Sequence, residues 1–405
     1  MNIYDQLVER GYIAQCTNEE GLRKLLSEEQ VSFYIGIDAT ADSLHAGHFL
    51  TLVVMKRLQE AGHRPIVLIG GGTTLIGDPT GRDEMRNIQS VEDIKEKAEK
   101  IRQQASRFLD FSEGKALMVN NADWLSHLNY ISFLRDYGPH FSINRMINME
   151  SYQSRLDKGL TLLEFNYMPM QAYDFLHLYR ELGCRVQMGG SDQWSNIIGG
   201  IDLIRKLEGQ EAFGLTFNLI TTSSGEKMGK TVKGALWLDP EKTSAHEFFQ
   251  YWRNVEDESV DTLLKRYTFL SLEKIEELTS EEGAALNKAK EVLAYELTKM
   301  VHGEEEASRA LASAKSLFGS GGEAELPAID LSRDRIGQEW LSVLCDLGIV
   351  SSRNDGRRLM QQNGLLLNGE RLTDISATLS EEDFPSGEAL VRRGKKMYTK
   401  IKLVD

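Results

Sequence analysis

The distribution of glycine between residues 36 and 81 restricts the fold most strongly. Eight glycines fall between positions 36 and 81, where they separate apolar runs. The runs at 31–37 and 65–69 have the length of buried strands, and the segment HFLTLVVMKRLQEA (48–61) between them has helical length and ends before Gly62. Strand, helix and strand in this order predict a parallel, right-handed α/β layer. Apolar runs at 116–119 and 184–188 continue the alternation.

The rest of the chain changes character twice. A single hydrophobic core seldom grows beyond ~250 to 300 residues, so 405 residues imply two or three domains. Residues 239–317 show helical patterns without clear strands, and GSGGEAELP (319–327) has the composition of a linker. We therefore expect an α/β domain over 1–225, an α-helical domain over 226–318, a linker over 319–336 and a small domain over 337–405.

The net charge is distributed unevenly between the same parts of the chain. The chain has 47 Lys+Arg and 61 Asp+Glu, a net charge of -14, while residues 337–405 carry ten of each sign. The first 336 residues therefore hold the whole excess. Bulk coating of nucleic acid is excluded, because non-specific affinity comes from basic residues that neutralise phosphates. A local basic site on the neutral tail stays open.

The compartment follows from what the sequence lacks. Cys16, Cys184 and Cys345 are far apart, which favours neither a disulfide framework nor a CxxC zinc site. No apolar run approaches the ~18 to 20 residues of a membrane span. Asp5 and Glu9 are wrong for a secretory or transit peptide. We expect a cytoplasmic protein without a membrane partner.

The first candidate motif follows the first predicted strand. ATADSLHAGH places Thr40, His45 and His48 at the start of a helix, where unpaired N–H groups and the helix dipole favour a polyphosphate. Two solvent-facing histidines are the alternative. A metal site is disfavoured, because no carboxylate or thiol completes it nearby.

Two glycine-containing loops are further candidates. GGGTTLIGDPTGR (70–82) is not a dinucleotide fingerprint, but it lies at the carboxyl end of a predicted parallel strand, where such sheets bind ligands; a plain surface loop is the alternative. GEKMGKT (225–231) has three residues between its glycines instead of the four of a P-loop. Lys227 and Lys230 could still reach phosphates from it, and a solvated turn is the alternative.

The most informative pattern lies on a predicted helix from 161 to 182. Its TLLE start has the residues of a capping box. Tyr167, Gln171 and Asp174 fall within about 60° of one another on a helical wheel, opposite an apolar face. This polar stripe either lines a site or faces solvent. Pro169 inside the helix is expected to kink it, for a site or only for packing.

GGSDQ (189–193) follows the fourth predicted strand. Asp192 and Gln193 on a glycine turn suit ribose hydroxyls. A helix N-cap at Ser191 or Asp192 is the competing interpretation, and both can hold.

The tail combines arginines with a hairpin. Arg353, Arg357 and Arg358 belong to one predicted helix, and Asn368-Gly369 between apolar segments predicts a tight turn. RRGKK (392–396) adds four positive charges. Phosphate contact or a solvated basic face would each explain this pattern.

Five motifs occur along the chain in a fixed order: HAGH, GDPTGR, a helix with YMPMQAYD, GGSDQ and KMGKT. With these motifs the chain resembles the bacterial tyrosyl-tRNA synthetases, class I ligases whose signatures are written HIGH and KMSKS. The resemblance extends over essentially the whole chain. It implies a Rossmann-like catalytic domain, a helical anticodon-side domain and a small α+β, αL-type tail of the ribosomal-protein S-four type.

The resemblance also implies the reaction and its partners. L-tyrosine and ATP would form tyrosyl adenylate and pyrophosphate, and the tyrosyl group would then pass to the 3′ end of tRNA(Tyr). Magnesium would accompany the triphosphate without a protein metal site. Family members are homodimers.

Roles for individual residues follow from the resemblance alone. The phenol hydroxyl of tyrosine would contact Tyr34 and Asp174, and its ammonium group would contact Asp78, Tyr167 and Gln171. ATP and ribose contacts would come from Asp38, Gly47, Asp192, Gln193 and Lys230. The triphosphate would be surrounded by Thr40, His45, His48, Arg82, Arg86, Lys227, Lys230 and Thr231. RNA would contact Arg353, Arg357, Arg358, Arg392, Arg393, Lys395 and Lys396.

The sequence departs from the signatures at a few positions. Ala39 stands where Pro is frequent, Ala46 replaces Ile, and Gly229 and Thr231 replace the two serines of KMSKS. Arg82 stands where Lys is common, which keeps the charge but leaves its catalytic share open. Both signature lysines are present.

Two rival functions remain. A tryptophan enzyme of the same fold is disfavoured by the Tyr34 and Asp174 pair and by the tail. A catalytically silent RNA-binding relative is disfavoured by the presence of His45, His48 and the two lysines.

Overall fold

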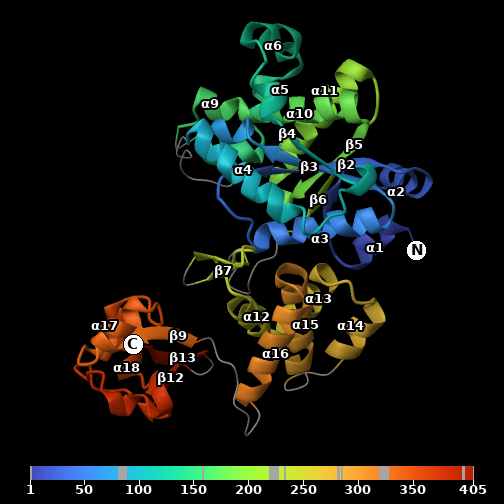
Figure 1. Ribbon diagram of the computed structural model, residues 1–405. Coiled ribbons are helices and arrows are strands. Elements are labelled where there is room, and N and C mark those ends of the chain that lie inside the picture. Colours follow the sequence, from blue (N-terminus) through green and yellow to red (C-terminus); the bar gives the residue numbers. More distant parts are fainter. Residues whose placement is uncertain are drawn as a thin grey trace.

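The computed structural model describes residues 2–80, 89–156, 159–218, 228–231, 234–280, 283, 286–318, 328–394 and 397–404. Its elements form an α/β part, a helical part and a C-terminal part with a second sheet (Figure 1). The predicted linker segment 319–327 lies outside the described residues.

A six-stranded sheet organises the first part. Its strand order is β1-β6-β5-β2-β3-β4, and every pair is parallel except β1 with β6. The strands are β1 (Ile13–Cys16), β2 (Ser32–Asp38), β3 (Arg64–Gly70), β4 (Leu117–Asn120), β5 (Cys184–Gly190) and β6 (Phe213–Phe217). The predicted parallel α/β layer is confirmed, and β1 and β6 extend it.

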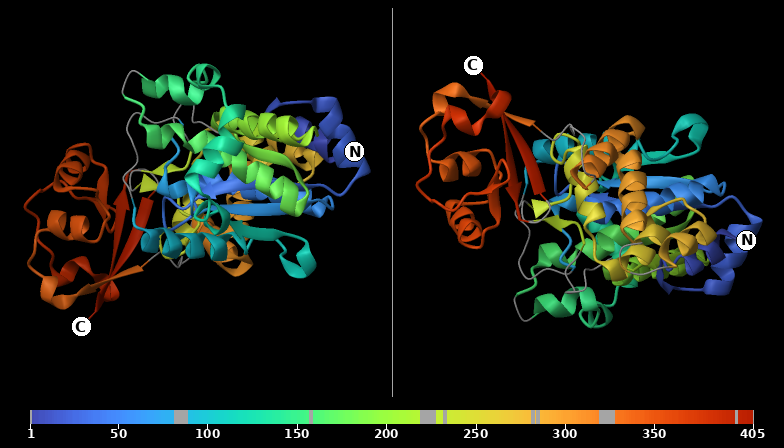
Figure 2. Two further views of the ribbon diagram at one scale, coloured as in Figure 1. Left: turned by 90° about the horizontal axis from the view of Figure 1, so that it is seen from above. Right: turned by 90° about the horizontal axis from the view of Figure 1, so that it is seen from below.

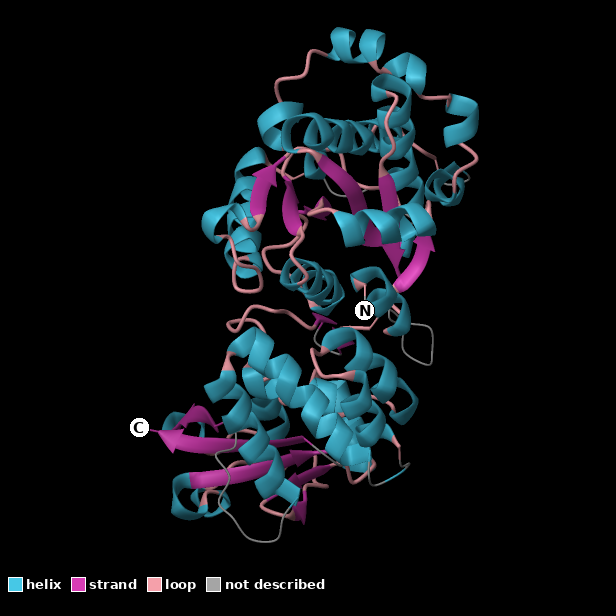
Figure 3. Cartoon of the chain, turned by 90° about the vertical axis from the view of Figure 1, so that its right-hand side faces the viewer, coloured by secondary structure: helices cyan, strands magenta, loops and turns pink. Residues whose placement is uncertain are grey.

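Helices cover both faces of this sheet (Figure 3). α10 (Tyr167–Leu182) and α11 (Trp194–Glu208) pack on each other and on β5, while α3 (Ala46–Glu60) and α4 (Val91–Ala105) pack on β3. Strands that are covered on both faces are buried along their whole length and have nearly continuous apolar sequences. β6 is accordingly buried at every residue. The other helices of this part are α1 (Ile3–Glu9), α2 (Glu19–Glu28), α5 (Ala122–Leu125), α6 (Tyr130–Asp136), α7 (Ile143–Met146), α8 (Glu150–Leu156) and α9 (Leu162–Phe165).

The strand order places a candidate site. From β2 the chain moves outward to β3, and from β5 it moves in the opposite direction to β6. β2 and β5 are neighbours, so the topological switch point lies between their carboxyl ends. Ligands of open parallel sheets bind at such a crevice.

The predicted helix from 161 to 182 is two helices. Thr161 caps α9 with the expected capping box, and the chain breaks at Asn166 before α10 begins. The prediction of a kink at Pro169 is therefore wrong in position. Pro169 is the third residue of α10, in the first turn, where backbone N–H groups have no helical acceptor and a missing N–H costs little. Gly183, with φ of 61°, ends the helix as expected.

The helical part packs on the α3 side of the sheet (Figure 1), and in the view from below it lies in front of the α/β part (Figure 2). Its helices share one core with the first part. Phe49 of α3 lies against Phe248 and Tyr267, with ring centroids 6.3 and 5.5 Å apart. The helices are α12 (Ala245–Arg253), α13 (Val260–Tyr267), α14 (Leu272–Thr279), α15 (Leu286–His302) and α16 (Glu304–Phe318).

The C-terminal part has its own core and a five-stranded sheet of order β11-β10-β12-β13-β9. The predicted hairpin turn is confirmed: Asn368 and Gly369 have φ of 49° and 89° between β10 and β11. The elements are β9 (Ala328–Ser332), α17 (Trp340–Asp346), α18 (Arg353–Gln361), β10 (Leu365–Leu367), β11 (Glu370–Arg371), β12 (Glu388–Arg393) and β13 (Met397–Val404).

Within the described part of the chain, no helix is both long enough and apolar enough to cross a bilayer.

Candidate active site

A buried carboxylate lies at one end of the crevice. Asp174 of α10 is 1% exposed, and both of its oxygens accept hydrogen bonds, from Asn121 Nδ2 at 2.9 Å and from Trp124 Nε1 at 2.7 Å. Burial raises the pKa of Asp174 to about 7, the two donors oppose this, and the charge of Asp38 adds to it. The group therefore titrates near neutrality.

A phenol faces the same region. Tyr34 of β2 is 1% exposed, and its ring lies 5.3 Å from that of Phe175. Burial, and then the charge of Asp174, raise the pKa of Tyr34. The Tyr34 hydroxyl has no hydrogen-bond partner among the described residues. An unsatisfied buried hydroxyl costs about 1 to 3 kcal/mol, so this atom is suited to a ligand's polar group.

A second unsatisfied group adjoins it. Gln187 of β5 is aligned with Tyr34 of β2 in the parallel register, and it is 2% exposed. Its Oε1 also lacks a hydrogen-bond partner within the described residues. Two polar atoms on neighbouring strands are therefore suited to contact the same end of a ligand.

Hydrogen bonds connect Asp174 to the opposite side of the crevice. Asn121 Nδ2 also donates to Thr73 Oγ1 at 3.0 Å, and Thr73 Oγ1 donates to Asp38 Oδ1 at 2.8 Å. Tyr167 donates its phenolic proton to Asp38 Oδ2 at 3.0 Å. Residues from β2, the β3–β4 region and α10 are thereby fixed relative to one another, and such linkage keeps a binding site rigid.

A second buried carboxylate, that of Asp78, has its own hydrogen-bond partners. Asp78 is 7% exposed; its Oδ1 accepts from the Thr80 amide at 2.9 Å and its Oδ2 from Gln193 Nε2 at 2.8 Å. Gln171 Oε1 is buried without a hydrogen-bond partner in the described chain. Carboxylates and an amide oxygen are acceptors, which favours a cationic ligand group such as an ammonium.

These positions decide between several of the interpretations above. The polar stripe of α10 does not face solvent, because Tyr167 and Asp174 are buried and Gln171 is half-buried. The loop after β3 is not a plain surface loop up to residue 80, since Thr73, Thr74 and Asp78 are buried. Neither Ser191 nor Asp192 caps α11, whose N-cap is Gln193 without a side-chain capping bond.

The two histidines lie at the start of α3, as predicted, and both are half-buried. His45 is the N-cap: its Nδ1 accepts from the Gly47 amide at 3.0 Å, and His48 Nδ1 accepts from the His45 amide at 3.3 Å. The rings lie 4.0 Å apart. Removal from solvent and then the neighbouring His45 lower the pKa of His48 to about 3, so His48 is neutral at physiological pH. Use of Nδ1 as acceptor leaves Nε2 to donate towards an anion.

Close packing explains the glycine between the histidines. Gly47 is exposed, and a Cβ there would lie 2.8 Å from His45 Cε1. Thr40, on the turn after β2, is half-buried, and its amide donates to the Asp38 carbonyl at 2.8 Å.

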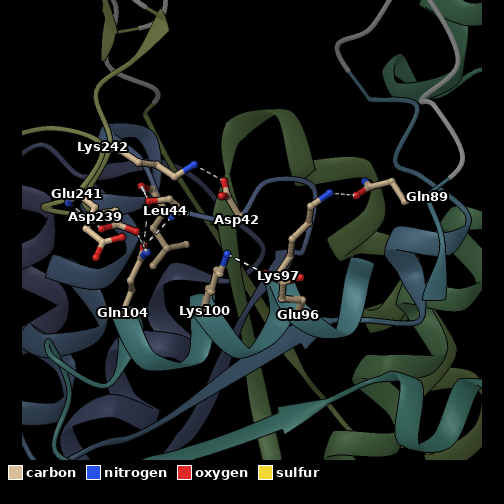
Figure 4. A network of polar contacts seen from close by, with 11 residues as sticks. Asp42, Leu44, Gln89, Glu96, Lys97, Lys100, Gln104, Asp239, Glu241 and Lys242 are labelled. Atoms are coloured by element: carbon tan, nitrogen blue, oxygen red, sulfur yellow. Dashed lines mark hydrogen bonds and ion pairs between the residues drawn. The ribbon is translucent and has the colours of Figure 1, made fainter. Parts of the chain in front are cut away.

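Polar contacts hold the segment just before His45 (Figure 4). Gln104 Oε1 of α4 accepts from the Leu44 amide at 2.8 Å and from Ser43 Oγ at 3.2 Å. Asp42 accepts from Lys242 at 2.5 Å, which lowers the pKa of Asp42. The segment that leads into the histidine helix is therefore held by α4 and by Lys242, which precedes α12.

Several predicted site residues lie outside the described part of the chain: Arg82, Arg86, Lys227, Lys395 and Lys396. The backbone of Lys230 and Thr231 forms the short strand β7 (Lys230–Thr231), paired with β8 (Gly234–Ala235), and their side chains lie outside what the structure describes. Within the described residues, no three His, Cys, Asp or Glu side chains are grouped closely enough to hold a metal ion.

The tail arginines differ in their surroundings. Arg357 and Arg358 are exposed on α18, and Arg358 pairs with Asp355 at 2.8 Å. Arg353 donates to Ser342 Oγ at 2.9 Å, and Arg393 donates to the Ile349 carbonyl at 3.0 Å. Arg392 lies with its guanidinium 6.0 Å from the Tyr398 ring centroid.

The sequence prediction missed four residues that the geometry brings into the site: Thr73, Asn121, Trp124 and Gln187. A usable signal existed for Asn121, because it follows the predicted strand 116–119 at the carboxyl edge where ligands bind. Gln187 is a lone amide inside an otherwise apolar run. Trp124 gave no distinct signal.

Known proteins are similar to this chain over its whole length. The family model for class I tRNA synthetases of the W and Y group matches residues 26–319, and the model for the tyrosine--tRNA ligase SYY-like C-terminal domain matches residues 320–401. The chain is 54% identical over 402 residues to a protein of Caldanaerobacter subterraneus subsp. tengcongensis and 52% identical over 403 residues to one of Clostridium perfringens. Both are called tyrosine--tRNA ligase, and 99% of each chain is covered.

Solved structures give the same result. A C-terminally truncated mitochondrial tyrosyl-tRNA synthetase of Aspergillus nidulans is similar with a TM-score of 0.71 and 28% identity, over 78% of this chain and 94% of that one. The tyrosyl-tRNA synthetase of Archaeoglobus fulgidus, solved with L-tyrosine, has a TM-score of 0.59 at 19% identity, over 76% of this chain and 99% of that one. The second likeness concerns the fold alone.

Proposed function

The chain belongs to the class I tRNA synthetases, among the tyrosine--tRNA ligases, and from this premise we propose which of its residues perform each step. It is a ligase that activates L-tyrosine with ATP, releases pyrophosphate and transfers the tyrosyl group to the 3′ end of tRNA(Tyr). Assignment of the steps to residues, the bound magnesium and the homodimer are proposals.

The phenol end of tyrosine binds between Tyr34 and Asp174. The substrate hydroxyl donates to Asp174 and satisfies the Tyr34 hydroxyl, and Gln187 adjoins them. Phenylalanine would leave these buried groups unpaired. Rejection of phenylalanine by a factor of about 10⁵ without editing is an established general value for tyrosine-activating enzymes of this type.

The ammonium end binds where acceptors converge. Asp78, Tyr167 and Gln171 surround it, and Asp38 fixes Tyr167. Gripping both ends of the substrate holds its carboxylate in one position, and fixed orientation can remove several kcal/mol from a barrier.

Activation requires little chemistry from the protein. The tyrosine carboxylate oxygen forms a bond to the α-phosphorus of ATP, the bond to the bridging oxygen breaks, and magnesium pyrophosphate leaves with that oxygen and its electron pair. His45 and His48 would donate from Nε2 to phosphate oxygens, with Thr40, Thr231, Lys227, Lys230, Arg82 and Arg86 stabilising the same charge. Magnesium enters as part of the nucleotide substrate.

The nucleoside and the RNA use different surfaces. Asp192, Gln193 and Gly47 lie at the crevice and are suited to the ribose and adenosine, and Gln193 links this region to Asp78. On the tail, exposed Arg357 and Arg358 are suited to RNA phosphates, together with Arg353, Arg392, Arg393, Lys395 and Lys396. We divide the chain accordingly into domains at 1–225, 226–318 and 337–405, and we place the enzyme in the cytoplasm, where its substrates occur.

A homodimer accounts for an unusual apolar surface. Ten large hydrophobic side chains of the described chain are exposed, and six of them fall between positions 130 and 162. Ile131 of α6, at 71% exposed, and Leu162 of α9, at 70%, are the extremes. Large exposed apolar side chains concentrated in one stretch of the chain are suited to an interface with a second copy. A mass of twice 45.7 kDa in solution, reduced to 45.7 kDa by Ile131→Asp, is expected; a monomer of the unmodified chain would contradict the dimer.

The buried Tyr34 hydroxyl near Asp174, which lacks a hydrogen-bond partner within the described chain, is the observation that carries the tyrosine assignment. The test is exchange of labelled pyrophosphate into ATP. Exchange is expected with tyrosine and at background level with tryptophan or phenylalanine. Exchange supported by tryptophan, or without any amino acid, would refute the assignment.

A further inference from the structure

The second signature packs directly on the first. Gly229 is buried, has φ of 93° and lies against the first turn of α3. A Cβ at this position would be 2.7 Å from Ala46 Cβ, and φ in this range is strained for any other residue. Gly229 and Ala46, two departures from KMSKS and HIGH, therefore form one close backbone contact.

Main-chain hydrogen bonds continue this contact. The Ala46 amide donates to the Leu236 carbonyl at 2.9 Å, and the Leu236 amide donates to the Gly229 carbonyl at 2.7 Å. The Leu238 amide donates to the Leu44 carbonyl at 2.8 Å. Residues 236–238 thus link the turn before Lys230 to the start of the histidine helix.

One side chain from the helical part completes the arrangement. Tyr251 of α12 accepts a hydrogen bond on its hydroxyl from the Gly229 amide at 2.8 Å. The Tyr251 ring is half-buried at the edge of the main core and lies at 86° to the Trp252 ring. Burial raises the pKa of Tyr251, so the hydroxyl is neutral at physiological pH. Gly229 is thereby held on its amide side by Tyr251 and on its carbonyl side by Leu236.

We propose that Tyr251 is a positioning residue for adenylate formation: its hydroxyl holds the Gly229 amide, so that the turn preceding Lys230 is seated on the first turn of α3 beside His45 and His48. Tyr251 contacts the backbone of the signature through its hydroxyl. The role rests on the proposed function, in which both signatures stabilise the departing pyrophosphate. It acts in the first step only, because pyrophosphate has left before the tyrosyl group is transferred.

The test removes the hydroxyl and keeps the ring. Tyr251→Phe loses one hydrogen bond to a buried amide, which is expected to lower the rate constant of adenylate formation about tenfold. The dissociation constant of tyrosine and the rate constant of transfer from preformed adenylate to tRNA should each stay within about twofold, because neither depends on the signature turn. Tyr295→Phe, on α15 of the same helical part and also partly buried, is the matched control and should leave all three unchanged.

A second variant tests the contact from its other side. Gly229→Ala places a methyl group against Ala46 at a strained φ, so adenylate formation should fall more than in Tyr251→Phe while tyrosine binding is retained. Combining the two changes should cost less than the product of their separate factors, because both disturb one contact.

The outcomes separate the inference from the function beneath it. If the unmodified protein shows no tyrosine-dependent exchange, the function fails. If it exchanges normally and Tyr251→Phe forms adenylate within twofold of it, the positioning role is overturned. The role is also overturned if Tyr251→Phe lowers tyrosine binding, transfer to tRNA and adenylate formation by the same factor, since a general structural defect would do that.

Discussion

The two halves of the active site are built by different means. The tyrosine half comprises Tyr34 and a group of residues far apart in the sequence that are joined by side-chain hydrogen bonds: Asp38, Thr73, Asn121, Tyr167 and Asp174. The phosphate half, which comprises His45, His48 and the turn 228–231, is joined mainly by main-chain hydrogen bonds to residues 236–238. A side-chain network can be broken one residue at a time, whereas a main-chain arrangement tolerates most side-chain changes.

The two halves are expected to differ in function, with tyrosine selection in one and adenylate formation in the other. In the proposed function, the tyrosine half contains buried polar groups suited to a phenol and an ammonium, so we expect it to act on binding. In the same proposal, the phosphate half would donate hydrogen bonds to charge that grows as pyrophosphate leaves, so we expect it to act on rate. Substitutions in each half should therefore affect different constants.

The largest effect is expected at the phenol end. Asp174→Asn replaces a carboxylate by an amide that cannot accept equally from Asn121, Trp124 and the substrate, and kcat/KM for tyrosine in pyrophosphate exchange should fall about 1000-fold, roughly 4 kcal/mol. Most of the loss should be in KM. A loss confined to kcat would contradict a binding role.

The next largest effect belongs to the phosphate half. His45→Asn removes the imidazole but keeps a residue that caps helices well, so α3 should remain intact. The rate constant of adenylate formation should fall about 100-fold, as for loss of one donor to a transition-state oxyanion, with tyrosine affinity retained. Calorimetric titration with tyrosine measures the affinity. A weakened affinity would contradict the assignment of binding to the tyrosine half and of rate to the phosphate half.

The pH dependence should differ between the halves. The pKa of Asp174 is raised to about 7, so the carboxylate is lost as pH falls, and tyrosine should bind about tenfold more weakly at pH 6 than at pH 8. Asp174→Asn should flatten this profile. His48, with a pKa lowered to about 3, should contribute nothing between these values.

The same pKa shift affects stability in a defined direction. Between about pH 4 and pH 7 the folded protein keeps a proton on Asp174 that the unfolded chain has lost. The contribution of Asp174 to the free energy of unfolding should therefore decrease as pH rises through this window. Denaturant titrations of the unmodified protein and Asp174→Asn at pH 5 and pH 8 measure the difference, and an opposite sign would contradict the raised pKa.

The smallest effect concerns a supporting residue. Trp124→Phe removes one donor to Asp174 while an aromatic ring remains against His177, whose centroid lies 4.3 Å away. KM for tyrosine should rise about fivefold, the equivalent of one hydrogen bond of about 1 kcal/mol, and the apparent pKa of tyrosine binding should rise too. An unchanged pKa would mean that Trp124 does not tune the carboxylate.

Features of the active site that depend on local periodicity were predicted from the sequence, and features that depend on long-range packing were not. Strand, helix and strand over 31–69 predicted the sheet, and the wheel positions of Tyr167, Gln171 and Asp174 predicted a shared stripe, because both depend on local periodicity. Whether the stripe faced solvent or a site could not be decided, since the stripe is covered by residues distant in sequence: Asp38, Asn121 and Trp124. Asn121 and Trp124 were missed for the same reason, because their partner Asp174 is 53 and 50 residues away.

The Pro169 prediction failed through competition between local signals. A proline inside an apolar helix pattern predicts a kink at that residue, but Asn166 ends α9 three residues earlier and leaves Pro169 in a first turn. The contact between Gly229 and Ala46 had no sequence signal, because the two positions are 183 residues apart and only the fold brings them together.

The separation of the halves can be measured most directly by transient kinetics on Asp174→Asn and His45→Asn side by side. The dissociation constant of tyrosine and the rate constant of adenylate formation at saturating tyrosine and ATP are obtained from one set of traces. Asp174→Asn should change chiefly the dissociation constant, and His45→Asn chiefly the rate constant. If both variants changed both constants by similar factors, the two halves would not be separable, and the division between selection and reaction would be wrong.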